Sequence, residues 1–338
     1  MTDNRATAPR THLTLGSYAL APHPGQDEAT FYAALRDVTF DAYELPVPTS
    51  DAAAHVTSWI LKHLPDDRDV VLTAIPSTMR RLGESPGYGL ASSDDEGRQA
   101  ALTDLAVVGE LAQRLADASG RRRVVAVEVH SAPGPDGGNA RGGAPGSSEA
   151  LASSLADIAG WGTGARIVVE HCDRLVSGQR PEKGFFSIAD EIAAVRRAVD
   201  LGLPAADDGG SPLGVALNWG RSAIEARDAA APVAHARAAA AAGVLRGVML
   251  SGATPEASEW GEPWTDAHIP PRGAAAALAA SATSALDVEQ ARATFAAAAG
   301  GLDFVGAKVS ARPLRASVTD RVALAEATLA LVRTAYGA

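Results

Sequence analysis

The sequence predicts an α/β fold in which eight strands alternate with helices, a (β/α)8 TIM barrel. Short apolar runs rich in β-branched residues recur along the 338 residues, and stretches with the apolar spacing of helices separate them. Buried parallel strands have this composition because both of their faces are covered. No G-x-G-x-x-G turn follows the first strand, which disfavours a doubly wound dinucleotide-binding sheet. We therefore treat residues 1–338 as a single barrel domain.

The predicted strands are apolar runs that end at Pro, Gly or polar residues. The fifth is the clearest, because in its sequence RIVVEHCD three β-branched residues lead directly into four polar ones. In a barrel, the C-terminal ends of all strands meet at the mouth where active sites lie. The eight strands are expected at residues 12–21, 40–47, 70–75, 124–130, 166–173, 213–218, 245–250 and 302–309.

Helices are expected wherever apolar residues repeat every three to four positions between two strands. The stretch 76–91 is interpreted as a loop because of Gly83, Gly87 and Gly89, and Ser187 is a predicted N-cap. Residues 132–146 are rich in Pro and Gly and are interpreted either as a flexible lid or as a disordered insertion. The expected helices span residues 27–38, about 50–63, 94–119, 147–158, 185–201, 222–242, 272–299 (two helices) and 319–336.

The overall charge and the terminal sequence limit the kinds of partner. The formal net charge of −10 repels phosphate backbones and anionic lipid, so we expect neither a nucleic acid nor a membrane as partner. Cys172 is the only cysteine, which excludes an intrachain disulfide. The first ten residues lack an apolar signal core. We therefore expect a cytoplasmic protein with a small-molecule substrate and leave open whether it forms an oligomer.

The rule that strand ends face the site selects the candidate functional residues. They include acids, bases and amides, and this mixture suits a small polyhydroxylated or carboxylated ligand. The strand ends contribute Glu44, Glu128 or His130, Glu170, Asn218, Ser251 and Lys308, and the loops that follow them contribute Arg221, His268 and Arg312.

Several motifs, in order along nearly the whole chain, resemble those of the xylose-isomerase-like TIM barrels. They are FDAYELPV, GLASSDDEGRQAAL, the strand end EVH, RIVVEHCD, GVALNWGRS and AHIPPRG. This group contains sugar isomerases, sugar epimerases and enzymes similar to endonuclease IV. The resemblance implies a TIM barrel and a reaction that moves a proton on a small carbohydrate or sugar acid.

The resemblance also implies a divalent metal, which epimerases of the group hold with Glu, Asp, His and Glu from strands five to eight. Glu170 matches the first of these positions, but Asn218, Leu250 or Ser251, and Lys308 stand at the others. An ammonium in place of a carboxylate repels a cation, so we expect no cofactor. The alternative is Mn, Mg, Co or Zn at a degenerate site that includes Glu170.

Three hypotheses for function remain open. In the first, the protein is an isomerase or epimerase in which Glu170 is the general base, Lys308 stabilises an enediolate and His268 is a further acid or base. The residues expected to bind the substrate are Glu44, His130, Asn218, Arg221, Ser251 and Arg312. In the second, the barrel binds a sugar without catalysis. In the third, Lys308 forms a Schiff base in a lyase reaction.

Overall fold

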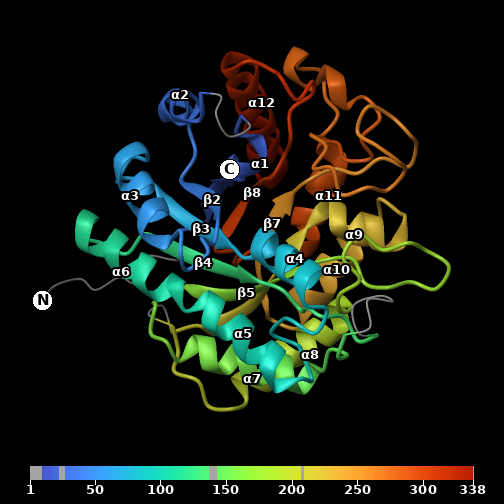
Figure 1. Cartoon of the computed structure of the whole chain (residues 1–338). Helices are drawn as coiled ribbons and strands as arrows, with labels where there is room; N and C mark the ends of the chain where they lie inside the picture. Colours follow the sequence, from blue (N-terminus) through green and yellow to red (C-terminus); the bar gives the residue numbers. More distant parts are fainter. Residues whose placement is uncertain (1–9, 23–26, 137–142, 207–208, 338) are drawn as a thin grey trace, which may run out of the picture.

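In the computed structural model, eight parallel strands close into a barrel in sequence order, and the last strand pairs with the first. The structure describes all residues except 1–9, 23–26, 137–142, 207–208 and 338 (Figure 1). The predicted (β/α)8 barrel is confirmed. The strands are β1 His12–Leu15, β2 Ala42–Pro46, β3 Asp69–Thr73, β4 Val124–Val129, β5 Arg166–His171, β6 Leu213–Asn218, β7 Leu245–Leu250 and β8 Phe304–Ala307.

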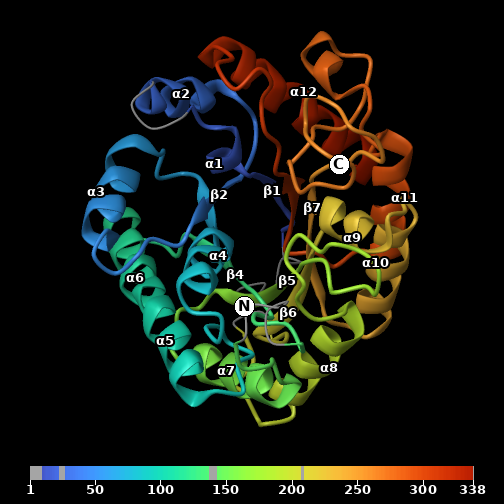
Figure 2. The ribbon, with the colours of Figure 1, turned by 45° about the vertical axis from the view of Figure 1, so that its right-hand side comes forward.

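Helices surround the strands on the outside of the barrel, as two views of the chain show (Figures 1 and 2). The long helix α12 packs against α2, so elements from the two ends of the chain lie side by side. The α-helices are α1 Ser17–Leu20, α2 Glu28–Ala34, α3 Ala53–His63, α4 Ile75–Glu84, α5 Asp95–Leu105, α6 Val107–Ser119, α7 Ser148–Ala159, α8 Ile188–Val199, α9 Trp219–Ala226, α10 Ala231–Ala241, α11 Val288–Ala298 and α12 Val318–Tyr336. The 3-10 helices are η1 Leu35–Asp37 and η2 Ala276–Ser281.

The interpretation of residues 76–91 as a loop is wrong, because α4 occupies its first half. Pro76 stands in the first turn of α4, where its missing N–H is no loss and its fixed φ suits a helix. Gly83 lies in the last turn. Pro76 and Gly83 therefore lie in the first and last turns of a helix, and only Gly87 and Gly89 belong to a loop.

Other boundaries also differ from the prediction. The helix expected at 94–119 is divided into α5 and α6 at Ala106, where no Gly or Pro marks the break. The helix expected at 222–242 is divided into α9 and α10, because Arg227 has a φ of 52° and Pro232 opens α10. The first of the two helices expected at 272–299 is the 3-10 helix η2. Strand β1 ends at Leu15 because α1 begins two residues later.

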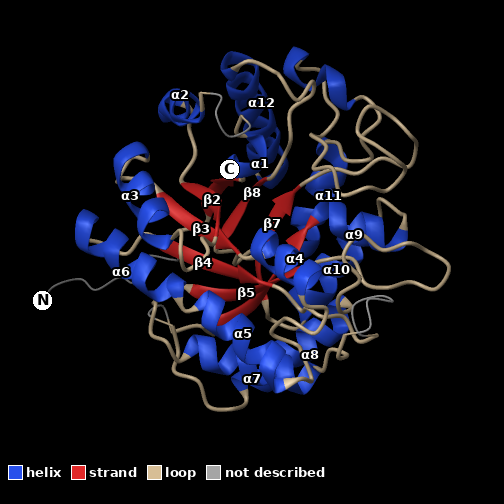
Figure 3. Cartoon of the chain, in the orientation of Figure 1, coloured by secondary structure: helices blue, strands red, loops and turns tan. Residues whose placement is uncertain are grey.

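Strand alternation builds the barrel interior in layers, with all strands central and helices outside (Figure 3). The lower layer is apolar and fully buried, and consists of Val71, Ala126, Val168, Ala216, Met249 and Phe304. Two residues further along four of these strands, the same inward face becomes polar, with Glu128, Glu170, Asn218 and Ser251. A buried apolar layer therefore closes the barrel interior below the polar layer at its mouth.

The Pro/Gly-rich segment 132–146 is only partly within the described residues, since 137–142 lie outside them. Its described flanks are held to each other, because the Gly146 N–H donates to the Gly134 carbonyl at 2.8 Å, and Gly146 also forms a bridge with Ser92. Whether the segment 132–146 is a lid or a disordered insertion stays a prediction, because residues 137–142 lie outside the described part of the chain. None of the helices in the described ranges is long and apolar enough to cross a membrane.

Candidate active site

Glu170 is the centre of a buried polar cluster at the mouth of the barrel. Its side chain lies at the end of β5 and is fully buried. The Lys308 ammonium and the Asn218 amide both donate to Oε1 at 3.1 Å. Arg221 lies 2.8 Å from Oε2, and so does the Nε2 of His130. Burial alone would raise the pKa of this carboxyl, but Arg221, Lys308 and His130 outweigh it and hold the pKa well below its usual range.

Lys308 lies between two carboxylates. Its Nζ is 2.5 Å from Oε1 of Glu44 and 3.1 Å from Oε1 of Glu170, and it lies 5.7 Å from the centre of the Tyr18 ring. Burial would lower the pKa of the ammonium, but Glu170 and Glu44 together raise it well above its usual value. Lys308 is therefore a charged group that joins β8 to β2 and β5.

Arg221 extends the cluster toward the loop that follows β7. Asn218 caps α9 by accepting the backbone N–H of Arg221 at 3.3 Å, which places this residue in the first turn beside Glu170. The Nε of Arg221 donates to Asp266 at 3.1 Å. Lys183 Nζ lies 3.0 Å from the same carboxylate. Burial would raise the pKa of Asp266, but Lys183 and Arg221 hold it well below its usual range.

The loop after β5 is folded so that Lys183 can reach this cluster. Asp173 at the strand end accepts the backbone N–H groups of Glu182 and Lys183 at 2.7 to 3.1 Å. These bonds turn the loop back toward the barrel mouth and satisfy part-buried backbone donors.

His268 lies beside Asp266 in the loop after β7. Its Nδ1 is 2.9 Å from Oγ of Ser251 and 3.3 Å from Oδ1 of Asp266. The residue has a φ of 51°, a left-handed conformation that costs energy for a side chain larger than glycine. Burial lowers the pKa of the imidazole to about 4, although Asp266 acts in the opposite direction. His268 is therefore neutral at pH 7.

Glu128 is the one acid of the inward face of β4, and neither of its oxygens has a hydrogen-bond partner within the described ranges. Burial raises its pKa well above the usual value, and the nearby charges of Glu170 and Glu44 raise it further. The neutral carboxylic acid is thus the favoured form. With Glu128 neutral, the three carboxylates of Glu44, Glu170 and Asp266 balance three cations, Lys308, Arg221 and Lys183.

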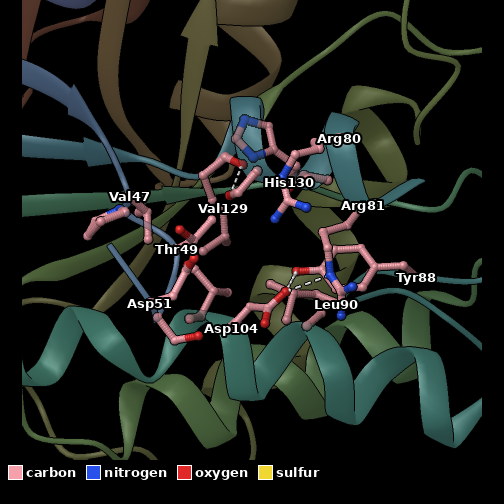
Figure 4. Close-up of a pocket in the computed structure, with 18 residues that line it drawn as sticks. Val47, Thr49, Asp51, Arg80, Arg81, Tyr88, Leu90, Asp104, Val129 and His130 are labelled. Atoms are coloured by element: carbon pink, nitrogen blue, oxygen red, sulfur yellow. Dashed lines mark hydrogen bonds and ion pairs between the residues drawn. The ribbon is translucent and has the colours of Figure 1, made fainter. Parts of the chain in front are cut away.

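A pocket of about 230 Å³ opens beside this cluster and reaches His130 (Figure 4). Its walls are the loop after β2, represented by Thr49 and Asp51, and the helices α4 and α5, which contribute Arg81 and Asp104. The Nε of Arg81 donates to Asp104 at 2.9 Å across the pocket wall. His130 belongs both to the pocket and to the Glu170 cluster, so it is the described side chain that connects them.

Most of the predicted site residues meet in one place. The cluster brings together eight of them: Glu44, His130, Glu170, Asn218, Arg221, Ser251, His268 and Lys308. Arg312 does not join it among the contacts within the described ranges. Its guanidinium lies 4.7 Å from the centre of the Trp260 ring, and its Nε donates to the Glu259 carbonyl at 3.4 Å. The functional roles assigned to all nine residues remain predictions.

Sequence reasoning did not select Tyr18, Lys183 and Asp266 as site residues. Lys183 and Asp266 stand in long loops, whose paths depend on tertiary contacts rather than on a periodic pattern. Tyr18 follows β1 within what was predicted to be the strand itself, and α1 turns it toward Lys308. A signal was available for Asp266, because it lies two residues before His268 in a loop already regarded as part of the site.

The donors at the barrel centre do not fit the divalent metal that the family resemblance implies. Both oxygens of Glu170 already contact cations, Lys308 and Arg221. The ammonium of Lys308 stands between the two carboxylates, Glu44 and Glu170, that would otherwise be ligands. A second cation there would be repelled at short range in a medium of low dielectric constant. The ammonium of Lys308 therefore occupies the place that a divalent ion would need.

Solved structures of other TIM barrels share this fold. A structure of D-psicose 3-epimerase solved in the presence of D-fructose aligns with a TM-score of 0.57 and 13% identity, covering 97% of this chain and 100% of that one. A xylose isomerase domain containing protein from Salmonella typhimurium aligns with a TM-score of 0.52 and 12% identity, covering 96% and 98%. At these identities the similarity establishes the fold alone.

Comparison at the level of sequence identifies the family. The chain belongs to the family described as a domain of unknown function, DUF4862, whose profile matches residues 14–324. An uncharacterized protein of Salmonella typhimurium is 35% identical over 267 residues, which are 77% of this chain and 78% of that protein.

Proposed function

We propose that the protein is an isomerase or epimerase that moves a proton on a small carbohydrate or sugar acid without a metal in the barrel. The observation that supports this proposal is the buried pair of His130 and Glu170, because His130 is also one of the residues that line the pocket beside α4 and α5. Active sites of this fold lie at the mouth of the barrel. A carboxylate that orients an imidazole is a common arrangement for a general base.

His130 has the protonation state that a general base requires. Burial lowers its pKa to about 4, against the opposing effect of Glu170, so the ring is neutral at pH 7. Because ionised Glu170 can only accept, the Nε2 of His130 carries the proton and donates it at 2.8 Å. The Nδ1 atom then holds a lone pair, and it has no hydrogen-bond partner within the described part of the chain. We assign this buried atom the removal of a proton from carbon, a step that requires the ring to be uncovered toward the pocket.

Glu170 is assigned to orientation rather than to direct proton transfer. Its oxygens already accept from Lys308, Asn218 and His130, and Arg221 contacts Oε2. Both of its oxygens are therefore engaged within the cluster, which leaves Glu170 to orient His130.

Lys308 and Arg221 supply positive potential beside the reacting region. Both are buried, and such fixed charges stabilise an enediolate more strongly than water does. In the proposed step, Nδ1 of His130 takes the proton from the carbon next to a carbonyl, and the electron pair of that C–H bond forms the enediolate. The proton then returns to the same carbon or to its neighbour. His268, held by Ser251 on the other side of the mouth, is a second candidate for proton transfer.

The contacts of the cluster also favour a second candidate function, binding without catalysis. Lys308, Arg221 and the part-buried Lys183 pair with three carboxylates, and such a cluster is electrostatically satisfied without any substrate. A Schiff-base reaction finds less support, because an ammonium held between Glu44 and Glu170 lacks the lone pair that adds to a carbonyl.

Exchange of a carbon-bound proton with solvent tests the proposed step. Ketoses, aldoses and sugar acids are incubated with the protein in D2O, and NMR follows the C–H groups next to the carbonyl. We expect deuterium to enter one such position in at least one substrate, also after treatment of the protein with a chelator. The variant His130→Gln should lose this exchange by about 100-fold or more, the usual contribution of a general base.

A matched control is His63→Gln on α3, which removes a histidine outside the cluster and should leave the exchange rate unchanged. Equal exchange by wild type and His130→Gln would remove His130 from the mechanism. A ligand that binds, as followed by its NMR line width, but shows no exchange would support the binding function instead. Loss of exchange on chelation would contradict the metal-free mechanism.

A further inference from the structure

A second buried cluster lies on the outer side of the barrel wall, behind the site described above. Strand alternation turns His171 away from the barrel interior, although its neighbour Glu170 points into it. His171 meets Glu225 from α9 and His235 from α10, and α8 closes the cluster with Glu191. Helices α8, α9 and α10 lie next to one another on this side of the barrel (Figure 1).

The side chains of His171, Glu225 and His235 are arranged like the ligands of one ion. Nε2 of His171 is 3.5 Å from Oε2 of Glu225, and Nε2 of His235 is 3.8 Å from Oε1. The two imidazole rings meet edge to face, with centres 4.9 Å apart. Each of the three residues offers one possible ligand atom, and these three atoms lie within 4.8 Å of one another. In a tetrahedral zinc site with bonds of about 2.0–2.2 Å, ligand atoms lie about 3.4 Å apart. Small side-chain movements would therefore close this cluster around an ion.

The orientation of His171 is fixed by a second carboxylate. Nδ1 of His171 is 2.7 Å from Oε2 of Glu191, whose other oxygen accepts from Ser131 Oγ at 2.6 Å. This arrangement directs Nε2 toward Glu225. A histidine that binds a metal through one nitrogen and donates to a carboxylate through the other is the usual form of a supported metal ligand.

The imidazole nitrogen of His171 that faces Glu225 is buried and poorly satisfied. This atom, Nε2, forms no hydrogen bond of acceptable geometry among the described residues, and its contact with Oε2 of Glu225 is 3.5 Å long. His171 is fully buried and Glu225 is nearly so, at 7% exposure. Buried polar atoms without partners are uncommon, and a missing ion is one explanation for them.

We propose that His171, Glu225 and His235 bind one divalent transition metal ion, for which Zn²⁺ is the best fit. Two imidazoles and one carboxylate suit zinc, whereas Mg²⁺ and Ca²⁺ require mainly oxygen ligands. Arg174 supports Glu225 by donating its backbone N–H at 2.9 Å and its Nε at 3.2 Å. A water molecule would complete the tetrahedron.

The metal would connect the barrel wall to the helix that carries Arg221. Glu225 stands one turn after Arg221 in α9, and His171 directly follows Glu170 in β5. A bond from the ion to both elements would fix α9 against β5 and thereby the contact between Arg221 and Glu170. This inference does not rest on the proposed function, since the zinc site is separate from the pocket and requires no substrate.

Zinc binding by untagged protein, stripped with a chelator and studied by calorimetry, tests the proposal. We expect one equivalent of Zn²⁺ per chain, and a loss of affinity of tenfold or more in His235→Ala. The controls are His63→Ala on α3 and His130→Gln in the barrel mouth, which should both bind zinc like wild type. Unchanged binding by His235→Ala would overturn the proposal. Zinc binding that is lost in His130→Gln would overturn it as well, since it would place the ion in the barrel.

Cobalt spectroscopy tests the site in the wild-type protein and needs no folded variant. Tetrahedral Co²⁺ with nitrogen and oxygen ligands absorbs strongly in the visible region, and added Zn²⁺ should remove this band by displacing the cobalt ion. Absence of metal binding by wild type would overturn the proposal. In that case His171 would instead carry both protons and pair with Glu191 and Glu225 as a purely structural ion pair.

Discussion

At the scale of single residues, His130 should make the stability of the protein depend on pH. Its pKa is about 4 in the folded state, because burial disfavours the charged ring, and near 6.5 in an unfolded chain. Between these values the unfolded state binds more protons, so stability falls as the pH decreases from 6.5 toward 4. This single group should lower the free energy of unfolding at pH 5, relative to pH 7, by on the order of 1–2 kcal/mol.

Urea denaturation of wild type and His130→Gln at pH 7 and pH 5 measures this contribution. The glutamine amide can still donate to Glu170 but does not titrate. The variant should therefore lose less stability than wild type between the two pH values, by the amount that His130 contributes. Equal losses in both proteins would show that the ring is not held neutral in the folded state.

The residues that were predicted and those that were missed differ in how their positions are determined. Glu170 and Lys308 lie at strand ends, and in a barrel the inward parity of each strand alone is enough to bring them to the same mouth. Their contact at 3.1 Å follows from topology. Asp266 and Lys183 meet only because two loops take particular paths, and one of these paths depends on backbone bonds to Asp173. No periodic pattern encodes such a meeting.

At the scale of elements, the passage from β1 to α1 depends on the small size of Gly16. Its φ of −69° is open to any residue, so steric contact alone decides what can stand there. A Cβ at this position would lie 2.8 Å from the Cα of Lys308 and 2.9 Å from Oε2 of Glu44. Gly16→Ala should therefore destabilise the fold by about 1–3 kcal/mol, the usual cost of overpacking.

Gly109→Ala on α6 is the matched control, because a Cβ there meets no atom within 4 Å. Alanine favours helix over glycine by about 0.5–1 kcal/mol, so this variant should be more stable than wild type. Urea midpoints of both variants measure the difference. Similar midpoints for Gly16→Ala and wild type would show that β1 and β8 can separate without cost.

The element boundaries show where local patterns suffice and where they do not. Strands β6 and β7 match their predicted limits, because mainly apolar runs of six residues end at Asn218 and before Ser251. Helix α4 was missed because Pro76 signals both the end of a strand and the first turn of a helix. The division of α5 from α6 at Ala106 has no local signal, since alanine is an excellent helix former.

At the scale of the whole molecule, the barrel was predictable because eight alternating units have few compact arrangements. Parallel strands with apolar residues on both faces require helices outside and a filled interior. Closure itself is set by long-range pairing: residues of β1 pair with those of β8, from His12 with Phe304 to Leu15 with Ala307. The identity of the residues in the mouth varies independently of this architecture, which is why the fold of the chain is better defined than its reaction.

Closure also predicts that the chain unfolds in one step despite its length of 338 residues. The main apolar core runs without interruption from Leu15 in β1 to Ala335 in α12, and opening the contact between β1 and β8 would expose two sheet edges at once. Far-ultraviolet circular dichroism and tryptophan fluorescence should therefore give coincident urea transitions. Two separate transitions would indicate that β1–β4 and β5–β8 unfold as independent half-barrels, and that the core between them contributes little to cooperativity.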